Sequence, residues 1–211
     1  MVRSSFALAS VATLALASAA SATLYTGAGF TIPDNNPNGA FTDIVITDDF
    51  LIADMTVSLI DLTHTWVGDL TATITHLESG FSQTLFARPG KTDPNTGVGD
   101  SSNFDGDYAF NDAFAGNLWT AATGGGTDFV VPGGNYFASA PLTGAQVSLL
   151  SVFGGMNAAG TWRLTISDQA GADTGGLAAW TLDFVKSPVP APGALALLGL
   201  AGLAGGRRRR A

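Results

Sequence analysis

The central part of the chain alternates apolar and polar residues with a period of two. Every second residue is apolar, and the residues between are threonine, serine, arginine or aspartate, in the stretches 55–59, 70–74, 162–166 and 180–184. A β-strand turns successive side chains to opposite faces, so each stretch predicts a strand with one buried face. Residues 41–46 and 147–153 are further strand candidates.

Helical periodicity is scarce between these stretches, where Gly, Asn, Asp and Ser recur about every ten residues. Many short antiparallel strands without helical spacers predict an all-β fold, either a β-sandwich or a jelly roll. Residues 90–141 show little periodicity, which is unusual inside a compact domain unless the loop is functional or fixed by a ligand. One domain over residues 23–187 is the simplest organisation.

The N-terminal segment has the layout of a secretory signal peptide. Arg3 supplies a positive charge, residues 6–17 are apolar, and residues 20–22 read Ala-Ser-Ala. We therefore expect residues 1–22 to be a signal peptide that is cleaved after Ala22. The apolar run is too short for a bilayer-spanning helix. A buried amphipathic or core helix is the alternative, and it is weaker because the run has no polar face.

The region between the two ends is strongly acidic. Residues 23–188 hold 17 acidic residues against four cations, a balance of −13, whereas the whole chain has a net charge of −8. Such a charge repels phosphate backbones and argues against nucleic-acid binding. All but one of the acids are aspartate, which is common in turns and calcium loops. The chain has no cysteine, so it has neither disulfides nor thiolate metal sites.

The sequence contains no recognisable catalytic motif. His64 and His76 are its only histidines, and no GxSxG, HExxH or P-loop pattern accompanies them. Both lie in or beside expected strands, where ordinary structural histidines are common. We therefore expect a protein that is not an enzyme.

Several motifs together resemble the P domain of proprotein convertases, also called the P/Homo B domain. The chain carries Gly-Asp-Leu at 68–70, a Gly-Thr-Trp strand over 160–168 that ends in an Asp, and a Gly-rich turn before the Trp-centred strand that includes Trp180. The piece YAFNDAFA, residues 108–115, is similar to an acidic loop element of the family, with Asn111 in place of its first Asp. The resemblance extends over roughly residues 29–185.

This resemblance implies a jelly-roll β-sandwich of the galactose-binding-like type. In convertases the domain packs beside a subtilisin-like protease and stabilises it, but the residues before Phe41 are too few for a Ser-His-Asp catalytic domain. The family's acidic loop positions correspond here to Asp69, Asp112, Asp168 and Asp173, which are therefore candidate ligands of Ca²⁺. The alternative is that these aspartates are turn formers and solvated charges. Trp162 and Trp180 are expected in the core.

The C-terminal segment, residues 188–211, resembles the PEP-CTERM sorting signal of exopolysaccharide-producing Gram-negative bacteria. It opens with Val189-Pro190-Ala191-Pro192, where Ala191 replaces the usual Glu, and it ends in the arginine cluster Arg207, Arg208, Arg209 and Arg210. The apolar run between them, residues 193–206, reaches about 21 Å as a helix, which is short of the roughly 30 Å hydrocarbon core. Arginines would remain on the cytoplasmic side. A permanent membrane anchor, with a transmembrane helix, is the alternative.

The resemblance to a sorting signal implies an exosortase-type partner and a transient stay at the inner membrane, followed by release to the cell surface or the extracellular space. Two classes of function follow. The first is a non-enzymatic cell-surface or matrix module, associated with exopolysaccharide or biofilm, that binds carbohydrate or protein. The second is an accessory domain in proteolysis by a serine-type endopeptidase, suggested by the P-domain resemblance alone.

Overall fold

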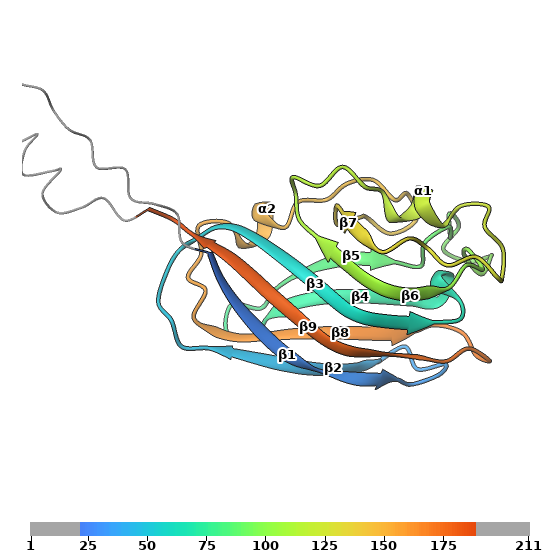
Figure 1. Ribbon diagram of the computed structural model, residues 1–211, viewed down its shortest axis with the longest axis horizontal. Coiled ribbons are helices and arrows are strands. Elements are labelled where there is room, and N and C mark those ends of the chain that lie inside the picture. Colours follow the sequence, from blue (N-terminus) through green and yellow to red (C-terminus); the bar gives the residue numbers. More distant parts are fainter. Residues whose placement is uncertain (1–21, 189–211) are drawn as a thin grey trace, which may run out of the picture. The chain divides into compact units, whose positions relative to one another are not determined.

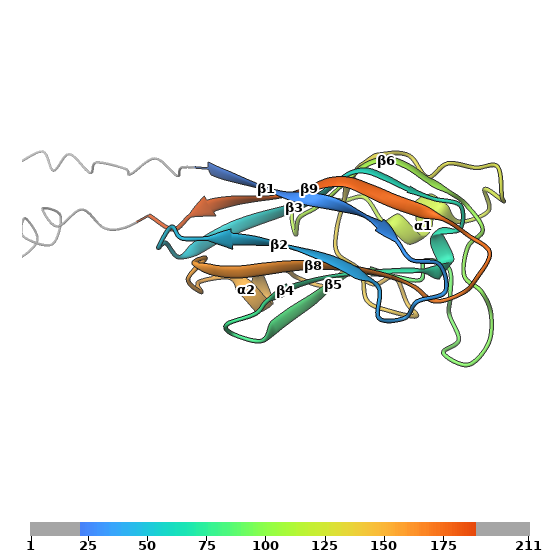
Figure 2. The same cartoon turned by 90° about the horizontal axis from the view of Figure 1, so that it is seen from below.

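Two β-sheets pack face to face in the computed structural model, which describes residues 22–188 (Figures 1 and 2). The first sheet has five strands in the order β1 (Ala22–Ile32), β9 (Gly175–Lys186), β3 (Ile52–His64), β6 (Phe104–Phe110) and β7 (Gly134–Tyr136). The second sheet has four strands in the order β2 (Ala40–Ile46), β8 (Gly160–Asp168), β4 (Leu70–His76) and β5 (Phe81–Ala87).

The expected all-β sandwich is confirmed. All strand pairs are antiparallel except β6 with β7. The helical elements of the described residues are short, namely η1 (Val67–Asp69), α1 (Leu118–Ala122) and α2 (Leu150–Phe153). Within residues 22–188, no helix has the length and apolar character needed to cross a membrane.

The period-two pattern identifies the core correctly. On β3 the alternate residues Met55, Val57 and Leu59 are buried, and β4 buries its own alternate apolar residues in the same way. Both predicted core tryptophans are fully buried and lie on different sheets. Each indole N–H has a partner, since Trp162 donates to the carbonyl of Ala158 and Trp180 donates to Oγ1 of Thr42, both at 2.9 Å.

The prediction of a strand over residues 147–153 is wrong, because this segment contains α2. The carboxylate of Asp112 accepts hydrogen bonds from the backbone N–H groups of Leu149 and Leu150 at 2.7 and 3.1 Å. Ser148 Oγ accepts another from the N–H of Ser151 at 2.9 Å. These acceptors satisfy N–H groups that a helix leaves unpaired at its first turn, so an apolar run begins a helix here.

The long stretch 90–141 is more regular than the sequence predicts, since it contains β6, α1 and β7. Strand β6 was missed because Gly106, with φ +157°, occupies the inward position between Phe104 and Tyr108 and interrupts the apolar alternation. Opposite this glycine, the register of β3 shifts between Leu59 and Leu62. A bulge of this kind hides a strand from a period-two search.

The two described ends of the chain lie side by side. Residue Ala22 on β1 pairs with Val185 on β9, so the start of the first strand and the end of the last strand meet at one end of the sandwich. The expected signal peptide, apart from Ala22, and the sorting segment from Val189 onward lie outside the described residues.

We predict that Gly27→Ala destabilises the sandwich, because a Cβ at this position would overlap the indole ring of Trp180. Trp180 is completely buried and cannot move aside, so overpacking should lower the free energy of unfolding by about 1–3 kcal/mol. Chemical denaturation measures this change. Gly171→Ala is the control, since its Cβ would lie 3.6 Å from Cβ of Asn35 in an ordinary contact. Equal effects of the two substitutions would contradict the packing described here.

Candidate functional site

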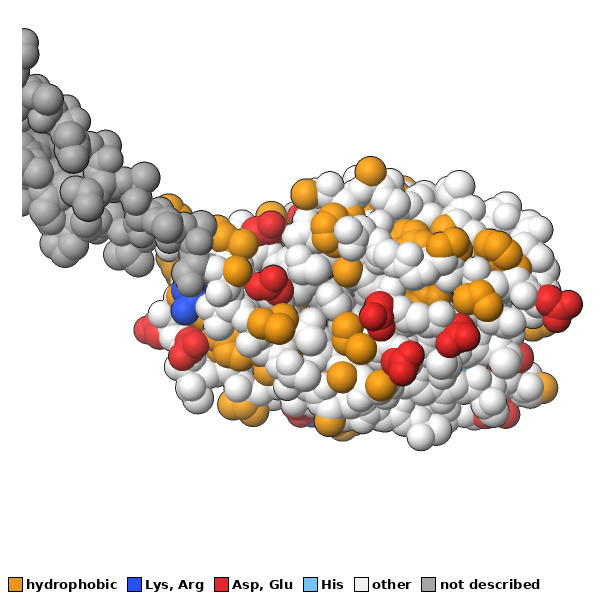
Figure 3. All heavy atoms as spheres, viewed as in Figure 1, with side chains coloured by type: hydrophobic (Ala, Val, Ile, Leu, Met, Phe, Trp, Pro, Cys, Tyr) orange, Lys and Arg blue, Asp and Glu red, His pale blue; other side chains and the backbone are white. Residues whose placement is uncertain are grey.

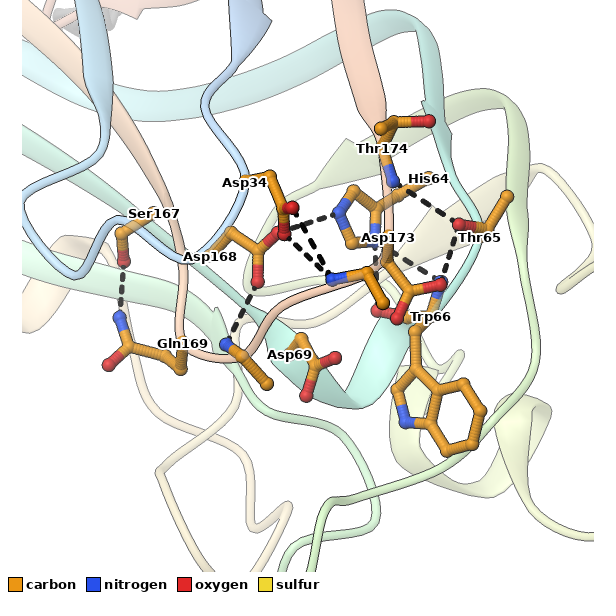
Figure 4. Close-up of polar contacts among 12 residues, drawn as sticks. Asp34, His64, Thr65, Trp66, Asp69, Ser167, Asp168, Gln169, Asp173 and Thr174 are labelled. Atoms are coloured by element: carbon orange, nitrogen blue, oxygen red, sulfur yellow. Dashed lines mark hydrogen bonds and ion pairs between the residues drawn. The ribbon is translucent and has the colours of Figure 1, made fainter.

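A cluster of polar side chains, most of them buried, lies at the end of the sandwich away from the described chain ends (Figure 4). Here β3 ends at His64, β8 ends at Asp168, and η1 leads into β4 with Asp69. The antiparallel register brings these three element ends together although they are far apart in sequence. We refer to His64, Asp69, Asp168 and Asp173 as the polar cluster.

The centre of the polar cluster is a buried pair of side chains from different sheets. Nε2 of His64 lies 3.2 Å from Oδ2 of Asp168, and neither side chain is exposed. Nδ1 of His64 contacts the backbone of Trp66, and Oδ1 of Asp168 accepts a hydrogen bond from the N–H of Ala170 at 3.1 Å. All polar atoms of the pair therefore have hydrogen-bond partners, as is usual for a buried pair with a structural role. We refer to this link between the two sheets as the buried tie.

The carboxyl group of Asp69 lies beside this pair and is only 3% exposed. The pKa of Asp69 is raised from 3.8 to about 6, and burial is the main cause. Arg88 acts in the opposite direction, while the neighbouring Asp168 and Asp173 contribute to the increase. The Arg88 guanidinium donates to Oδ1 of Asp69 at 3.3 Å. Asp69 is thus a desolvated acid whose charge is only partly compensated.

The loop after β8 is fixed by two further aspartates. Oγ1 of Thr65 donates to Oδ1 of Asp173 at 2.7 Å, and the N–H of Ala172 donates to the carboxylate of Asp34 at 3.1 Å. Ala172 has φ +88°, a conformation that costs free energy for a residue other than glycine. These contacts hold the loop against the ends of β1 and β3.

Three of the four candidate calcium ligands come together, and the fourth does not. Asp69, Asp168 and Asp173 belong to the polar cluster, and the last two lie close enough to Asp69 to raise its pKa. Asp112 instead follows β6 and binds the first turn of α2, towards the other end of the sandwich (Figure 1). Three of the four residues that the sequence analysis grouped as calcium ligands therefore lie in one region, whereas Asp112 binds the start of α2.

The polar cluster does not form a ready calcium cage. In residues 22–188, no three His, Cys, Asp or Glu side chains converge closely enough to hold a metal ion. Both oxygens of Asp168 are engaged by His64 and Ala170. The remaining acids, Asp69 and Asp173, would need ligands from elsewhere because Ca²⁺ takes about 6–8 oxygen atoms. Calcium binding therefore stays a prediction.

His76 has a serine neighbour that the sequence did not indicate. Oγ of Ser79 lies 3.0 Å from Nδ1 of His76, within the turn that joins β4 to β5. Nε2 of the same ring lies 3.1 Å from the carbonyl of Ala159, and the side chain of Glu78 is bonded to Thr161. Ser79 Oγ also accepts a hydrogen bond from the N–H of Phe81, so these contacts close a hairpin turn.

Comparison with protein-family models supports the P-domain resemblance in part of the chain. The family model of the proprotein convertase P-domain matches residues 140–184, a segment that includes α2, β8 and most of β9. This match covers about a fifth of the chain. No curated protein matches the chain in sequence.

Two solved structures have limited similarity to the chain. One is the serine protease of Aeromonas sobria in complex with its chaperone, with 14% identity and a TM-score of 0.42 over 80% of this chain and 28% of that one. The other is the serine protease of Aeromonas sobria, with 12% identity and a TM-score of 0.41 over 79% of this chain and 27% of that one. The chain spans little more than a quarter of these proteases.

We predict that Asp69 makes the stability of the chain depend on pH. Its pKa is about 6 when folded, against an ordinary value of 3.8, so the folded state holds the proton more tightly than the unfolded state does. Burial of the charged form destabilises the fold above pH 6, and protonation removes this cost as the pH falls towards 4. Relative to Asp69→Asn, the wild type should lose about 2–3 kcal/mol of unfolding free energy between pH 4 and pH 7.

Denaturation of both proteins in EDTA across this pH range measures the difference. A constant gap between wild type and Asp69→Asn would contradict the assignment of a raised pKa to Asp69.

We also predict that millimolar calcium raises the thermal midpoint relative to EDTA, because an ion that binds only the folded form stabilises it. Since Asp173 lies beside Asp69 whereas Asp112 lies at α2, Asp173→Ala should abolish the shift and Asp112→Ala should preserve it. Identical midpoints in calcium and EDTA would exclude the calcium site.

Proposed function

We propose that this protein is a non-enzymatic, exported binding module built on a P-domain-like jelly-roll sandwich of the galactose-binding-like type. Its place of action is the cell surface or extracellular matrix of a Gram-negative bacterium, where it binds carbohydrate or protein. The observation that carries this proposal is the state of the two histidines, which are the side chains best suited to general acid–base catalysis near neutral pH.

Neither histidine is available to a substrate. The His64 side chain is completely buried, and both of its ring nitrogens have protein partners. His76 is 4% exposed, and its ring packs on Trp162 with centroids 5.0 Å apart. Its contact with Ser79 belongs to a tight turn in which the serine Oγ also binds the backbone. Both ring nitrogens of His76 are held, one by Ser79 Oγ and the other by the carbonyl of Ala159, so the contacts of this pair serve to close the turn.

Export and sorting complete the proposal. The signal peptide would bring the chain across the inner membrane, and residues 188–211 would hold it there until an exosortase-type enzyme acts near Pro190. Support comes from the sequence motifs at both ends and from the pairing of Ala22 with Val185, which sets the two described ends side by side.

A role as an accessory domain in proteolysis is the second candidate, and the family match over residues 140–184 favours it. In that case the chain would bind a separate serine-type endopeptidase and stabilise it. The two candidates share a non-catalytic chain and differ in the partner.

We predict that the chain recovered from its native host ends near residue 190. Replacing Arg207 to Arg210 with serine should abolish this processing, because the arginine cluster stops translocation at a cost of several kcal/mol per residue. The uncut variant should then appear in the periplasm. Intact-mass spectrometry of the membrane, periplasmic and extracellular fractions gives the result.

Intact wild-type chain that remains in the membrane fraction would show a permanent anchor instead of a sorting signal. The released chain should also leave casein uncleaved. Cleavage by the purified chain would contradict the non-enzymatic assignment, whereas co-purification of a serine protease that the chain stabilises would favour the accessory role.

A further inference from the structure

A shallow cavity of about 520 Å³ opens on the outer face of the four-stranded sheet. Its polar floor is formed by residues from the two inner strands of this sheet and the following loop, namely Thr71, Ser167 and Gln169. Its rim carries three exposed prolines from three different loops, namely Pro37, Pro94 and Pro141. The volume lies within the range of about 300–1,000 Å³ that is typical of small-ligand sites.

The polar cluster lies directly behind this cavity. Because side chains alternate along β8, Asp168 points inward to His64 while its neighbours Ser167 and Gln169 line the cavity (Figure 4). Nε2 of Gln169 donates to Oγ of Ser167 at 2.8 Å, and the backbone N–H of Gln169 donates to the carbonyl of Asp69. The buried tie thus fixes the position of the cavity floor.

Strained backbone gathers around the same cavity. Arg88 and Leu142 line it with φ values of +45° and +65°. Asn35 and Ala172, at +48° and +88°, lie in the adjoining loops that the Asp34 carboxylate connects. Four of the five non-glycine residues with positive φ in residues 22–188 are therefore at this end. Such residues persist only where the surrounding structure enforces them, often at binding sites.

Hydroxyl groups continue from the cavity along the face of the sheet. The register places Thr71 beside Ser167, and the next row across the sheet contains Thr73, Thr165 and Thr84. On the same sheet, the hydroxyls of Thr75 and Thr161 bond to Ser82 and Glu78. The hydroxyls of Thr71, Thr73, Thr84 and Thr165, by contrast, have no hydrogen bond to another group within residues 22–188. Phe41 lies next to Thr165 and is 50% exposed. The guanidinium of Arg163 covers one face of its ring, 3.6 Å from the centroid, so the other face adds an apolar surface.

Two cations, Arg88 and Lys91, line the cavity, and other protein groups hold both of them. Arg88 donates to Asp69 and to the carbonyl of Gly68, and Nζ of Lys91 donates to two loop carbonyls at 2.7 Å. Arg163 forms a two-point contact with Asp43 at 2.8 and 2.9 Å. By contrast, acidic side chains are scattered over the face carried by β1, β9 and β3 (Figure 3). Arg88 pairs with Asp69, and Lys91 is only 8% exposed, so the groups that the cavity offers to a ligand are mainly hydroxyl and amide groups.

We infer that a neutral polysaccharide binds this face. Part of the polymer would lie in the cavity, and the adjoining sugar units would lie over the threonine rows. Unpaired hydroxyl and amide groups can exchange hydrogen bonds with sugar hydroxyls, while the prolines and Phe41 offer apolar contact to the C–H faces of the rings. This inference rests on the proposed binding function and selects carbohydrate as the ligand.

A peptide ligand fits the same features less well. Strand addition needs a free sheet edge, but Thr71 and Ser167 lie on β4 and β8, which are the two inner strands of the sheet. Recognition of a peptide by its side chains needs apolar or oppositely charged pockets, and this floor is neutral and polar.

Affinity electrophoresis of the full chain through gels that contain dextran, laminarin, galactomannan or anionic alginate tests the inference. We expect at least one neutral polymer to retard the chain. The double substitution T71V and T165V removes two hydroxyls at constant shape and should weaken this binding about tenfold or more. Thr181→Val is the matched control, because Thr181 lies on β9 in the other sheet, and its effect should be negligible.

Several outcomes would overturn the inference. Retardation by alginate alone would indicate binding through charge. No retardation by dextran, laminarin or galactomannan would contradict binding of a neutral polysaccharide. Equal weakening by T181V and by the double substitution would place the ligand elsewhere or show a general loss of structure, which thermal midpoints of all variants distinguish. These failures would leave the export, processing and lack of peptidase activity of the proposed function intact, since those are measured separately.

Discussion

The contact between His64 and Asp168 holds together the end of the sandwich on which the rest of the site depends. The two residues are 104 positions apart in the chain, lie on different sheets, and are separated by 3.2 Å with no exposure to solvent. Removing either partner would leave the other buried without compensation, which typically costs several kcal/mol. The pair therefore fixes how the end of β3 meets the end of β8.

Several features follow from this tie. With Asp168 turned inward, alternation along the strand turns Ser167 and Gln169 outward to form the cavity floor. Asp69 is buried next to the tie and acquires a raised pKa, and Arg88 connects it to the rim of the cavity. His64, which the sequence predicts to be a structural histidine, and Asp168, a candidate calcium ligand, thus support the cavity floor from behind. The cavity surface that they support offers mainly hydroxyl and amide groups, beside the cations Arg88 and Lys91, which are bonded to other protein groups.

The sequence predicted the sandwich and its core because alternation is a local property of each strand. It could not reveal β6, where Gly106 breaks the pattern, or α2, whose first turn is bound by Asp112 from 37 residues earlier in the chain. The aspartates Asp69, Asp168 and Asp173 were recognised through a family resemblance. The contact of His64 with Asp168 was not predicted, because no spacing in the sequence indicates that the ends of two strands on different sheets meet.

We infer that the end of the sandwich held by the His64–Asp168 contact carries a binding surface on the outer face of the four-stranded sheet. Titration of the isotope-labelled chain with a neutral oligosaccharide that it binds, followed by amide chemical shifts in NMR spectra, tests this claim most directly. The account predicts that the largest shifts map to Thr71, Thr73, Thr165, Ser167 and Gln169. Shifts confined to the five-stranded sheet, or to the turn around Ser79, would contradict it.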